Sequence, residues 1–259
     1  MEITYCSAGG CAVRDVCAAD KTLPYFSVAQ SVSGEYEVWI GSEHVVTSPM
    51  GAFAVPALVR QQIKHLVPRT GEMIVQWAFL DVTVNGFYAL DALYDFPLLF
   101  SAKEGRELHD LISALRKTED CVEACAVAAR KASAYSLLAF LMQFAREKEY
   151  VFADDHLRCA AEYMREHYAE PLSVEKLSRI AGLSQSSFFY KFKDTYRRTP
   201  MEYLSEMRLR QGAKLLLGTD KPVAEVAALC GYDDPLYFSK AFRRKFSASP
   251  LQYRRTQKW

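Results

Sequence analysis

Hydrophobic and polar residues follow two different periods along the chain, and the period changes near residue 101. Between residues 20 and 100 they alternate, as in GEYEVWI (34–40), where Tyr36, Val38 and Ile40 are separated by single residues. Gly and Pro interrupt this region at intervals suited to short strands and turns. The pattern predicts a small antiparallel barrel or sandwich.

After residue 101 apolar residues recur at helical spacing in two stripes that a polar turn, KTED (117–120), separates. We therefore expect an antiparallel pair of helices. The pair either packs on the barrel or forms a subunit interface, and the pattern leaves both open. The first stripe is Leu108, Leu111, Ile112 and Leu115, and the second is Val122, Cys125, Ala126, Ala129, Ser133, Leu137, Phe140 and Phe144.

A charged segment, REKEYVFADD (146–155), has the composition of a linker. The chain beyond it has helical periodicity to its end. A first helix carries Leu157, Ala161, Met164 and Tyr168, and Glu170 with Pro171 ends it. We expect two domains, residues 1–150 and residues 155–259.

One pattern occurs twice in the second domain. SVEKLSRIAGLS (173–184) and PVAEVAALCGYD (222–233) place three apolar residues and a Gly at identical spacing. In each copy a pair of Phe residues four apart follows, Phe188 with Phe192 and Phe238 with Phe242. A helix that ends on a Gly turn and leads into a second helix is the helix-turn-helix unit, whose second helix can enter a DNA major groove.

Charge is distributed unevenly between the two predicted domains. Residues 155–259 hold 19 Lys and Arg against 12 Asp and Glu, a formal charge of +7, whereas residues 1–154 hold 13 against 19, a formal charge of −6. A basic half is typical of a domain that meets a polyanion.

The same region resembles a known family. PMEYLSEMRLRQGAKLLL (200–217) and PVAEVAALCGYDDPLYFSKAFRRKFSASPLQYRR (222–255) are similar to the DNA-binding domain of the AraC/XylS transcription regulators, over residues from about Leu157 to Arg255. The resemblance implies two helix-turn-helix units joined by a helix over residues 200–217, with recognition helices in successive major grooves about 34 Å apart. It also implies that the first domain is a cupin-like, effector-sensing barrel followed by dimerising helices. The expected fold class is thus α+β, with an all-α second domain.

In this family the position two after the first Phe of the pair in each recognition helix usually carries Arg or Lys. Lys240 occupies it in the second unit and Tyr190 in the first. A tyrosine cannot make the bidentate guanine contact of an arginine, so we expect the two units to read different bases. The residues expected to contact bases or phosphates are Ser184, Gln185, Ser186, Phe189, Tyr190, Lys191, Lys193, Pro235, Leu236, Tyr237, Ser239, Lys240, Arg243 and Arg244.

The predicted barrel offers a second candidate site, for a small-molecule effector. The family's sugar sensors use aromatic side chains and a few polar groups inside such a barrel, and Trp39, Arg60, His65 and Trp77 are the matching candidates here. A sugar is one option for the effector. The alternative is a degenerate barrel that binds nothing.

Enzymatic and metal-dependent functions find little support. The barrel region has only His44 and His65 and no His-x-His pair, so we expect no catalytic residues, no metal and no cofactor. A thiol- or metal-responsive regulator stays open as a further alternative, because cysteines gather at two places. These are Cys6, Cys11 and Cys17 near the start, and Cys121 and Cys125 four residues apart.

The seven cysteines are odd in number and scattered, as in a reducing cytosol. We see no export signal and no apolar run of the roughly 18 to 20 residues that cross a membrane. The sequence therefore predicts a cytoplasmic, sequence-specific transcription regulator. We expect a homodimeric activator that binds double-stranded DNA and a small-molecule effector and acts with RNA polymerase, without a membrane partner.

Overall fold

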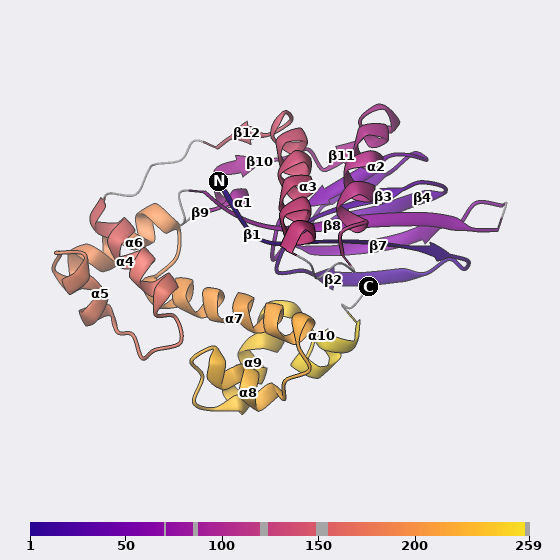
Figure 1. Cartoon of the computed structure of the whole chain (residues 1–259). Helices are drawn as coiled ribbons and strands as arrows, with labels where there is room; N and C mark the ends of the chain where they lie inside the picture. Colours follow the sequence, from indigo (N-terminus) through magenta and orange to yellow (C-terminus); the bar gives the residue numbers. More distant parts are fainter. Residues whose placement is uncertain (70, 85–87, 120–123, 149–154, 257–259) are drawn as a thin grey trace. The chain divides into compact units, whose positions relative to one another are not determined.

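The structure is a computed structural model, and it describes residues 1–69, 71–84, 88–119, 124–148 and 155–256. The chain folds into two compact units, Met1–Lys148 and Glu149–Trp259. The first unit combines strands with helices and the second is helical (Figure 1). The predicted α+β fold class is confirmed.

The first unit contains a larger antiparallel sheet in the order β1-β8-β3-β6-β11, with β9 also pairing with β8. Strands that are far apart in the sequence pair in this sheet, as residues 2–13 and 73–84 do, so long-range contacts build it. The strands are β1 (Glu2–Val13), β3 (Phe26–Ser31), β6 (Ala52–Val55), β8 (Met73–Val84), β9 (Tyr88–Ala89) and β11 (Leu99–Phe100).

A smaller sheet has the order β2-β7-β4-β5 and is also antiparallel. On β4 the side chains of Tyr36 and Val38 are fully buried while their neighbours are half-buried, as the alternation predicts. The ring of Tyr36 meets Phe53 of β6 edge-on at 5.1 Å between centroids, so the two sheets face each other. The strands are β2 (Ala18–Thr22), β4 (Glu35–Ile40), β5 (Glu43–Val46) and β7 (Arg60–Leu66).

The sequence pattern missed β1, the longest partner of β8. Its segment carries two adjacent glycines and several small residues, which favour turns over strands. The structure explains Gly9: a Cβ there would come within 2.6 Å of the Trp77 ring. Tertiary packing therefore selects glycine inside this strand, against its local propensity.

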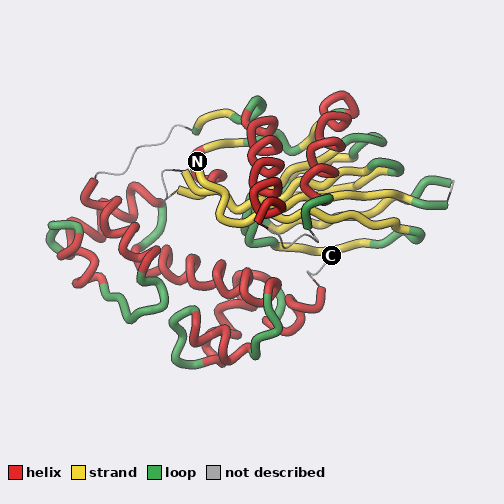
Figure 2. Tube along the Cα trace, viewed as in Figure 1, coloured by secondary structure: helices red, strands yellow, loops and turns green. Residues whose placement is uncertain are grey.

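Two helices, α2 (Ala102–Arg116) and α3 (Ala124–Met142), lie on the same side of the larger sheet (Figures 1 and 2). Helix α2 begins at Ser101, which forms a capping box with Glu104. Leu108, Ile112 and Leu115 are fully buried, so the predicted stripe of this helix is confirmed.

Buried amide groups also fix α2 to the sheet. The Gln76 amide on β8 donates to Gln30 Oε1 at 2.6 Å and to the His109 carbonyl at 3.2 Å. Ser113 donates to Gln76 Oε1 at 3.2 Å. Because each buried amide finds partners, the helix is held in one position on the sheet.

The predicted stripe of α3 is wrong in its first half. Cys125 and Ala129 are exposed, and Val122 and Cys121 lie outside the described residues. Small residues fill the first turns of α3, so the period of its apolar positions cannot be read there. The face that is buried consists of Ala134, Leu137, Leu138, Phe140 and Leu141.

Helix α3 also corrects the expectation about membrane-spanning segments. Within the described residues Cys125–Met142 is long and apolar enough, by length and composition alone, to cross a membrane. The prediction required an unbroken apolar run, which Arg130 and Lys131 interrupt. The core helix of a soluble protein passes the same test, and α3 contacts α2 and β1.

The predicted linker over 146–155 is only partly a linker. Arg146–Glu147 forms a short strand, β12, that pairs with Tyr94–Asp95, β10. A short helix, α1 (Leu90–Leu93), precedes β10. Residues 149–154 lie outside the described residues.

The second unit consists of seven helices among the described residues. The first, α4 (Asp155–Glu166), ends two residues before Tyr168, which the sequence pattern placed on it. The others are α5 (Val174–Ile180), α6 (Gln185–Tyr196), α7 (Pro200–Gly218), α8 (Val223–Leu229), α9 (Pro235–Phe246) and α10 (Pro250–Thr256).

Candidate nucleic-acid interface

The first helix-turn-helix unit consists of α5, a turn at Gly182 and α6. Ser173 caps α5 by accepting a hydrogen bond from the Lys176 amide at 3.2 Å. Gly182 has a φ of 63°, which lets the chain turn sharply. Phe188 and Phe192 are fully buried and fix one side of α6 against the unit. The opposite side of α6 is left facing solvent.

The second helix-turn-helix unit repeats this arrangement with α8, a turn at Gly231 and α9. Gly231 has a φ of 76°, and a Cβ there would lie 2.6 Å from the Ala169 carbonyl oxygen. Phe238 and Phe242 are fully buried on α9. Helix α9 is capped by Asp234, whose carboxylate accepts from the Leu236 amide at 2.8 Å. The predicted helix-turn-helix pattern is thus present twice.

Helix α7 connects the two helix-turn-helix units and contacts α6, α8, α9 and α10. Thr199 and Glu202 form a capping box at its start, where Pro200 occupies the first turn. Leu209 and Leu216 are buried on it. The connecting helix predicted over residues 200–217 is confirmed.

Two arginines tie the ends of preceding helices to this scaffold. Arg208 donates to the Tyr168 carbonyl at 2.6 Å and to the Glu170 carbonyl at 2.7 Å, just beyond the end of α4. Arg254 of α10 donates to the Leu216 carbonyl of α7 at 3.2 Å and also to the Lys221 carbonyl. Both guanidinium groups satisfy carbonyls left open near a helix end. The resemblance included both residues, but the sequence did not indicate these contacts.

The solvent-facing sides of α6 and α9 carry the residues predicted to contact DNA. Tyr190 is 76% exposed, and Leu236 and Tyr237 are 72% and 61% exposed. Pro235 and Ser239 are half-buried, and Ser239 donates to the Pro235 carbonyl at 2.8 Å. The remaining predicted residues are all exposed: Ser184, Gln185, Ser186, Phe189, Lys191, Lys193, Lys240, Arg243 and Arg244. Their contact with DNA stays a prediction.

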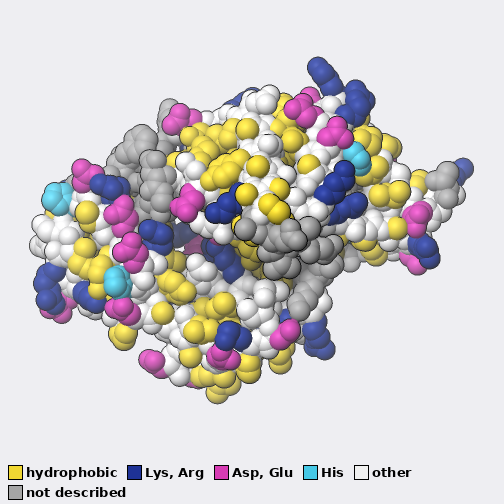
Figure 3. All heavy atoms as spheres, in the orientation of Figure 1, with side chains coloured by type: hydrophobic (Ala, Val, Ile, Leu, Met, Phe, Trp, Pro, Cys, Tyr) yellow, Lys and Arg dark blue, Asp and Glu magenta, His cyan; other side chains and the backbone are white. Residues whose placement is uncertain are grey.

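Basic residues of the two recognition helices differ in their surroundings. Beyond the end of α6, Arg197 pairs with Asp194 at 3.1 Å. In the last turns of α9, by contrast, Arg243 and Arg244 form no ion pair among the described residues. The face in Figure 3 shows Lys and Arg mixed with Asp and Glu over the helical unit, so the net charge of this unit is not gathered in one patch there. Free cations at the end of α9 are therefore the best candidates for phosphate contacts.

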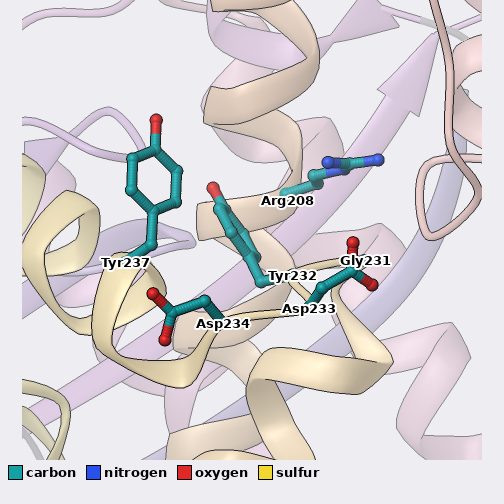
Figure 4. Close-up of a pocket in the computed structure, with 6 residues that line it drawn as sticks. All are labelled: Arg208, Gly231, Tyr232, Asp233, Asp234 and Tyr237. Carbon is teal, nitrogen blue, oxygen red and sulfur yellow. The ribbon is translucent and has the colours of Figure 1, made fainter.

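An open hollow of about 400 Å³ lies beside the first turn of α9 (Figure 4). The Arg208 guanidinium lies over the Tyr232 ring, 5.8 Å from its centroid, and the Tyr237 ring is 6.1 Å from the Tyr232 ring. Asp233 and Asp234 line the same hollow. Two carboxylates disfavour a phosphate here, so the first turn of α9 suits base contacts better than backbone contacts.

The structure does not bring the four effector candidates together. Trp39 stacks on His44 at 4.9 Å between centroids, and Arg60 is exposed and donates to Asp20 at 2.9 Å. Both side chains are on the outer side of the smaller sheet, away from the buried Tyr36 and His65. His65 and Trp77 are buried, on the smaller and the larger sheet respectively. Gln76, next to Trp77 on β8, faces the other way and reaches α2.

The chain is similar to known proteins chiefly in its helical unit, Glu149–Trp259. A helix-turn-helix domain family matches residues 177–256. The chain is 30% identical over 149 residues to the HTH-type transcriptional activator RhaS of Enterobacter sp. (strain 638), which covers 58% of this chain and 54% of that protein. It is 38% identical over 91 residues to the probable transcriptional regulator LumQ of Photobacterium leiognathi, covering 35% and 37%. The chain thus spans about half the length, or less, of these curated relatives.

A solved structure resembles the chain over nearly its whole length. It is unsaturated fatty acid-bound ToxT from Vibrio cholerae, with a TM-score of 0.59 and 10% identity, covering 98% of this chain and 96% of that one. At this identity the likeness concerns the fold alone. Its two-part arrangement agrees with a sheet-rich first unit followed by a helical one. The match over residues 177–256 and the transcription regulators to which the chain is similar thus support the resemblance of its helical unit to the DNA-binding domain of the AraC/XylS regulators.

Proposed function

We propose that the chain is a sequence-specific DNA-binding transcription regulator, with residues 155–259 as its DNA-binding domain. The observation that carries this proposal is the presence of two recognition helices, α6 and α9, that both pack against α7. Each helix buries a pair of Phe side chains on one side and exposes its other side to solvent. Two such helices can enter successive major grooves on one side of a duplex.

Within this proposal the two helices divide their tasks. Lys240 is exposed and free of ion pairs among the described residues, so it can reach guanine O6 or N7. Tyr190 can pack on a thymine methyl or donate one hydrogen bond. Arg243, Arg244, Lys191 and Lys193 hold phosphates, and the capped first turn of α6 at Ser184 approaches the backbone.

The first predicted domain, residues 1–150, is the sensing and dimerising part in this proposal. Of the four candidates for effector binding, His65 and Trp77 are the two that are buried within it. The exposed side of α3, which includes Val127 and Tyr135, is available for a second copy of the chain. The relative RhaS is named an activator, and activation through RNA polymerase in the cytoplasm is the mode that we propose here.

Selection of bound sequences from random DNA with the purified full chain tests the proposal. We expect enrichment of a motif, and enrichment of none would contradict sequence-specific binding. Lys64→Ala, on the outer side of β7 where the Lys64 amine pairs with Glu37 at 3.5 Å, is a control that should leave the motif unchanged.

A second measurement separates an effector-controlled regulator from one with a degenerate barrel. In the first case a small molecule raises the melting temperature of the first unit and changes operator binding. If a broad panel changes neither quantity, control by protein contacts or abundance replaces the effector.

A further inference from the structure

An exposed thiol and a buried imidazole meet just before β2, and the proposed DNA binding uses neither of them. The Cys17 sulfur lies 3.3 Å from His65 Nδ1. Cys17 is exposed to solvent, whereas only 6% of His65 is exposed. A thiol beside a fixed imidazole is the arrangement of an activated nucleophile, because the imidazole can remove the thiol proton.

The backbone holds these two residues opposite each other. The His65 amide donates to the Cys17 carbonyl at 2.9 Å, which continues the pairing of β2 with β7 by one residue beyond Ala18 and Lys64. On its other neighbouring strand, the His65 ring meets the fully buried Tyr36 ring edge-on, with 5.0 Å between centroids. Strand pairing and ring packing thus fix the imidazole beside the thiol.

His65 Nδ1 has two neighbours on Cys17, the thiol and the carbonyl oxygen, both at 3.3 Å. A neutral imidazole without a proton on Nδ1 accepts a hydrogen bond from the thiol. Once the proton has moved to Nδ1, the same nitrogen can donate to the thiolate or to the carbonyl oxygen. The geometry therefore suits the pair both before and after the proton transfer.

The surrounding groups favour a neutral base and a charged thiolate. Burial lowers the pKa of His65, the Cys17 carbonyl acts against this, and the charge of Lys21 on β2 lowers it further. His65 is therefore neutral at pH 7 and free to accept a proton. Burial lowers the pKa of Lys21 to about 7, and the charges of Cys11 and Cys17 act against this, so a thiolate at Cys17 and a protonated Lys21 favour each other. Burial raises the pKa of Tyr36, so this phenol stays neutral.

Four other cysteines differ from Cys17. Cys230 is buried, and burial raises its pKa to about 12. Burial also raises the pKa of Cys6 and of Cys11. Cys159 on α4 is exposed but forms no hydrogen bond among the described residues. Exposure and a neighbouring base thus coincide at Cys17.

We propose that Cys17 is a modification site that takes up a low-molecular-weight disulfide, such as oxidised glutathione, with His65 as the base. Residues 14–16, which precede the thiol, are all exposed, so a solute can approach the sulfur from solvent. The inference goes beyond the proposed DNA binding and requires no effector inside the first unit.

The reaction is a thiol–disulfide exchange and needs no further oxidant. The Cys17 thiol proton passes to His65 Nδ1, and the sulfur lone pair attacks one sulfur of the small disulfide. A new S–S bond forms as the old one breaks, and the electron pair of the old bond leaves on the second sulfur. This leaving thiolate takes the proton from His65 and departs as a thiol. Cys17 is oxidised to a mixed disulfide and the small disulfide is reduced, and attack by another thiol reverses the step.

Incubation of the intact full chain with oxidised glutathione, followed by peptide mass spectrometry, tests this inference. At pH 7 Cys17 should form the mixed disulfide at least ~10-fold faster than Cys159, because only a few per cent of an ordinary thiol is ionised there. A change from pH 7.5 to pH 6.5 should slow Cys159 about tenfold but Cys17 less than ~3-fold, since His65 stays neutral. A rate at Cys17 no higher than that at Cys159, or a tenfold slowing of both, would overturn the inference.

A variant of the base sharpens the test. His65→Gln removes the proton acceptor, so it should slow Cys17 by at least ~10-fold and give it the pH dependence of Cys159. His44→Gln, on the exposed strand β5, is the matched control and should leave the rate at Cys17 unchanged. An unchanged rate in His65→Gln contradicts the role of His65. Because His65 is buried, the melting temperature of the variant is measured first, and if it does not fold, the pH dependence of the wild type decides.

Discussion

The two helix-turn-helix units have the same interior and different surfaces. In the first, Phe192 contacts Phe188, Tyr196 and Tyr203, with ring centroids 5.4, 4.3 and 5.5 Å away. In the second, Phe242 contacts Phe238, Phe246 and Tyr253 at 5.5, 4.3 and 5.1 Å. The rings occupy equivalent places, and each recognition helix ends on a residue with a φ near 55°, Arg197 or Ser247.

The solvent-facing positions do not repeat. Tyr190 in α6 corresponds to Lys240 in α9, and the N-caps are Ser184 and Asp234. The last turn of α6 carries Lys193, whereas that of α9 carries three basic residues in a row. Residues that build the motif are therefore preserved between the copies, while residues that could read DNA have diverged. Each of the following experiments compares the two copies.

The largest expected effect is the loss of a buried ring. Phe188→Ala and Phe238→Ala should each destabilise the helical unit by about 3–5 kcal/mol, because both rings are fully buried and leave a cavity. Urea unfolding of the full chain followed by circular dichroism measures this. Equal costs support a common interior, and a negligible cost in one copy would show that its motif is not packed as described. Tyr190→Ala, on an exposed side chain, is the control.

The turn glycines should differ. Both have positive φ, which costs an alanine roughly 1–2 kcal/mol. A Cβ at Gly182 would meet only His156, at 3.6 Å, but at Gly231 it would meet the Ala169 carbonyl oxygen at 2.6 Å. Gly231→Ala should therefore cost at least ~1 kcal/mol more than Gly182→Ala in the same unfolding measurement, because backbone must move. The reverse order would contradict the packing of the second turn.

Operator affinity should depend more on α9 than on α6. On the best selected sequence Lys240→Ala should weaken binding by about 1–3 kcal/mol, and Tyr190→Ala by about 1 kcal/mol or less. Tyr190→Phe keeps the ring and isolates the hydroxyl. Fluorescence anisotropy against operator and random DNA measures both. If Lys240→Ala loses equal affinity on the two DNAs, then Lys240 contacts phosphate only.

The smallest effect concerns salt. Arg243→Ala or Arg244→Ala should each reduce the slope of log affinity against log salt by about 0.9, because one phosphate contact is lost. The corresponding change in α6, Lys193→Ala, should change the slope by a similar amount only if Lys193 also holds a phosphate. Slopes unchanged by both arginine variants would remove the phosphate role of the last turn of α9.

Much of the second unit could be predicted from sequence because its signals are local. The Phe pair four residues apart and the Gly after an apolar helix each fix a conformation within one or two turns. The Asp234 cap and the Arg208 hydrogen bonds escaped prediction. The contacts of Arg208 join residues about forty positions apart, which no local pattern encodes.

The first unit could be predicted less well. Successive side chains of a strand point to opposite sides of a sheet, so Arg60 and His65, five residues apart on β7, cannot share a side. Trp39 likewise lies on the side of β4 opposite to the buried Tyr36. The small residues at the start of α3 likewise hid which side is buried. The burial of Lys21 was missed because a single lysine in a short strand normally faces water, and only the structure shows it inside.

The most direct test is selection from random DNA with the wild-type full chain, Lys240→Ala and Tyr190→Ala side by side. The wild type should enrich two elements about 10 base pairs apart, centre to centre. Each variant should lose preference at one position, in a different element, and leave the other element unchanged. A single element, or one in which both variants affect the same position, would contradict the account of two recognition helices that read different bases.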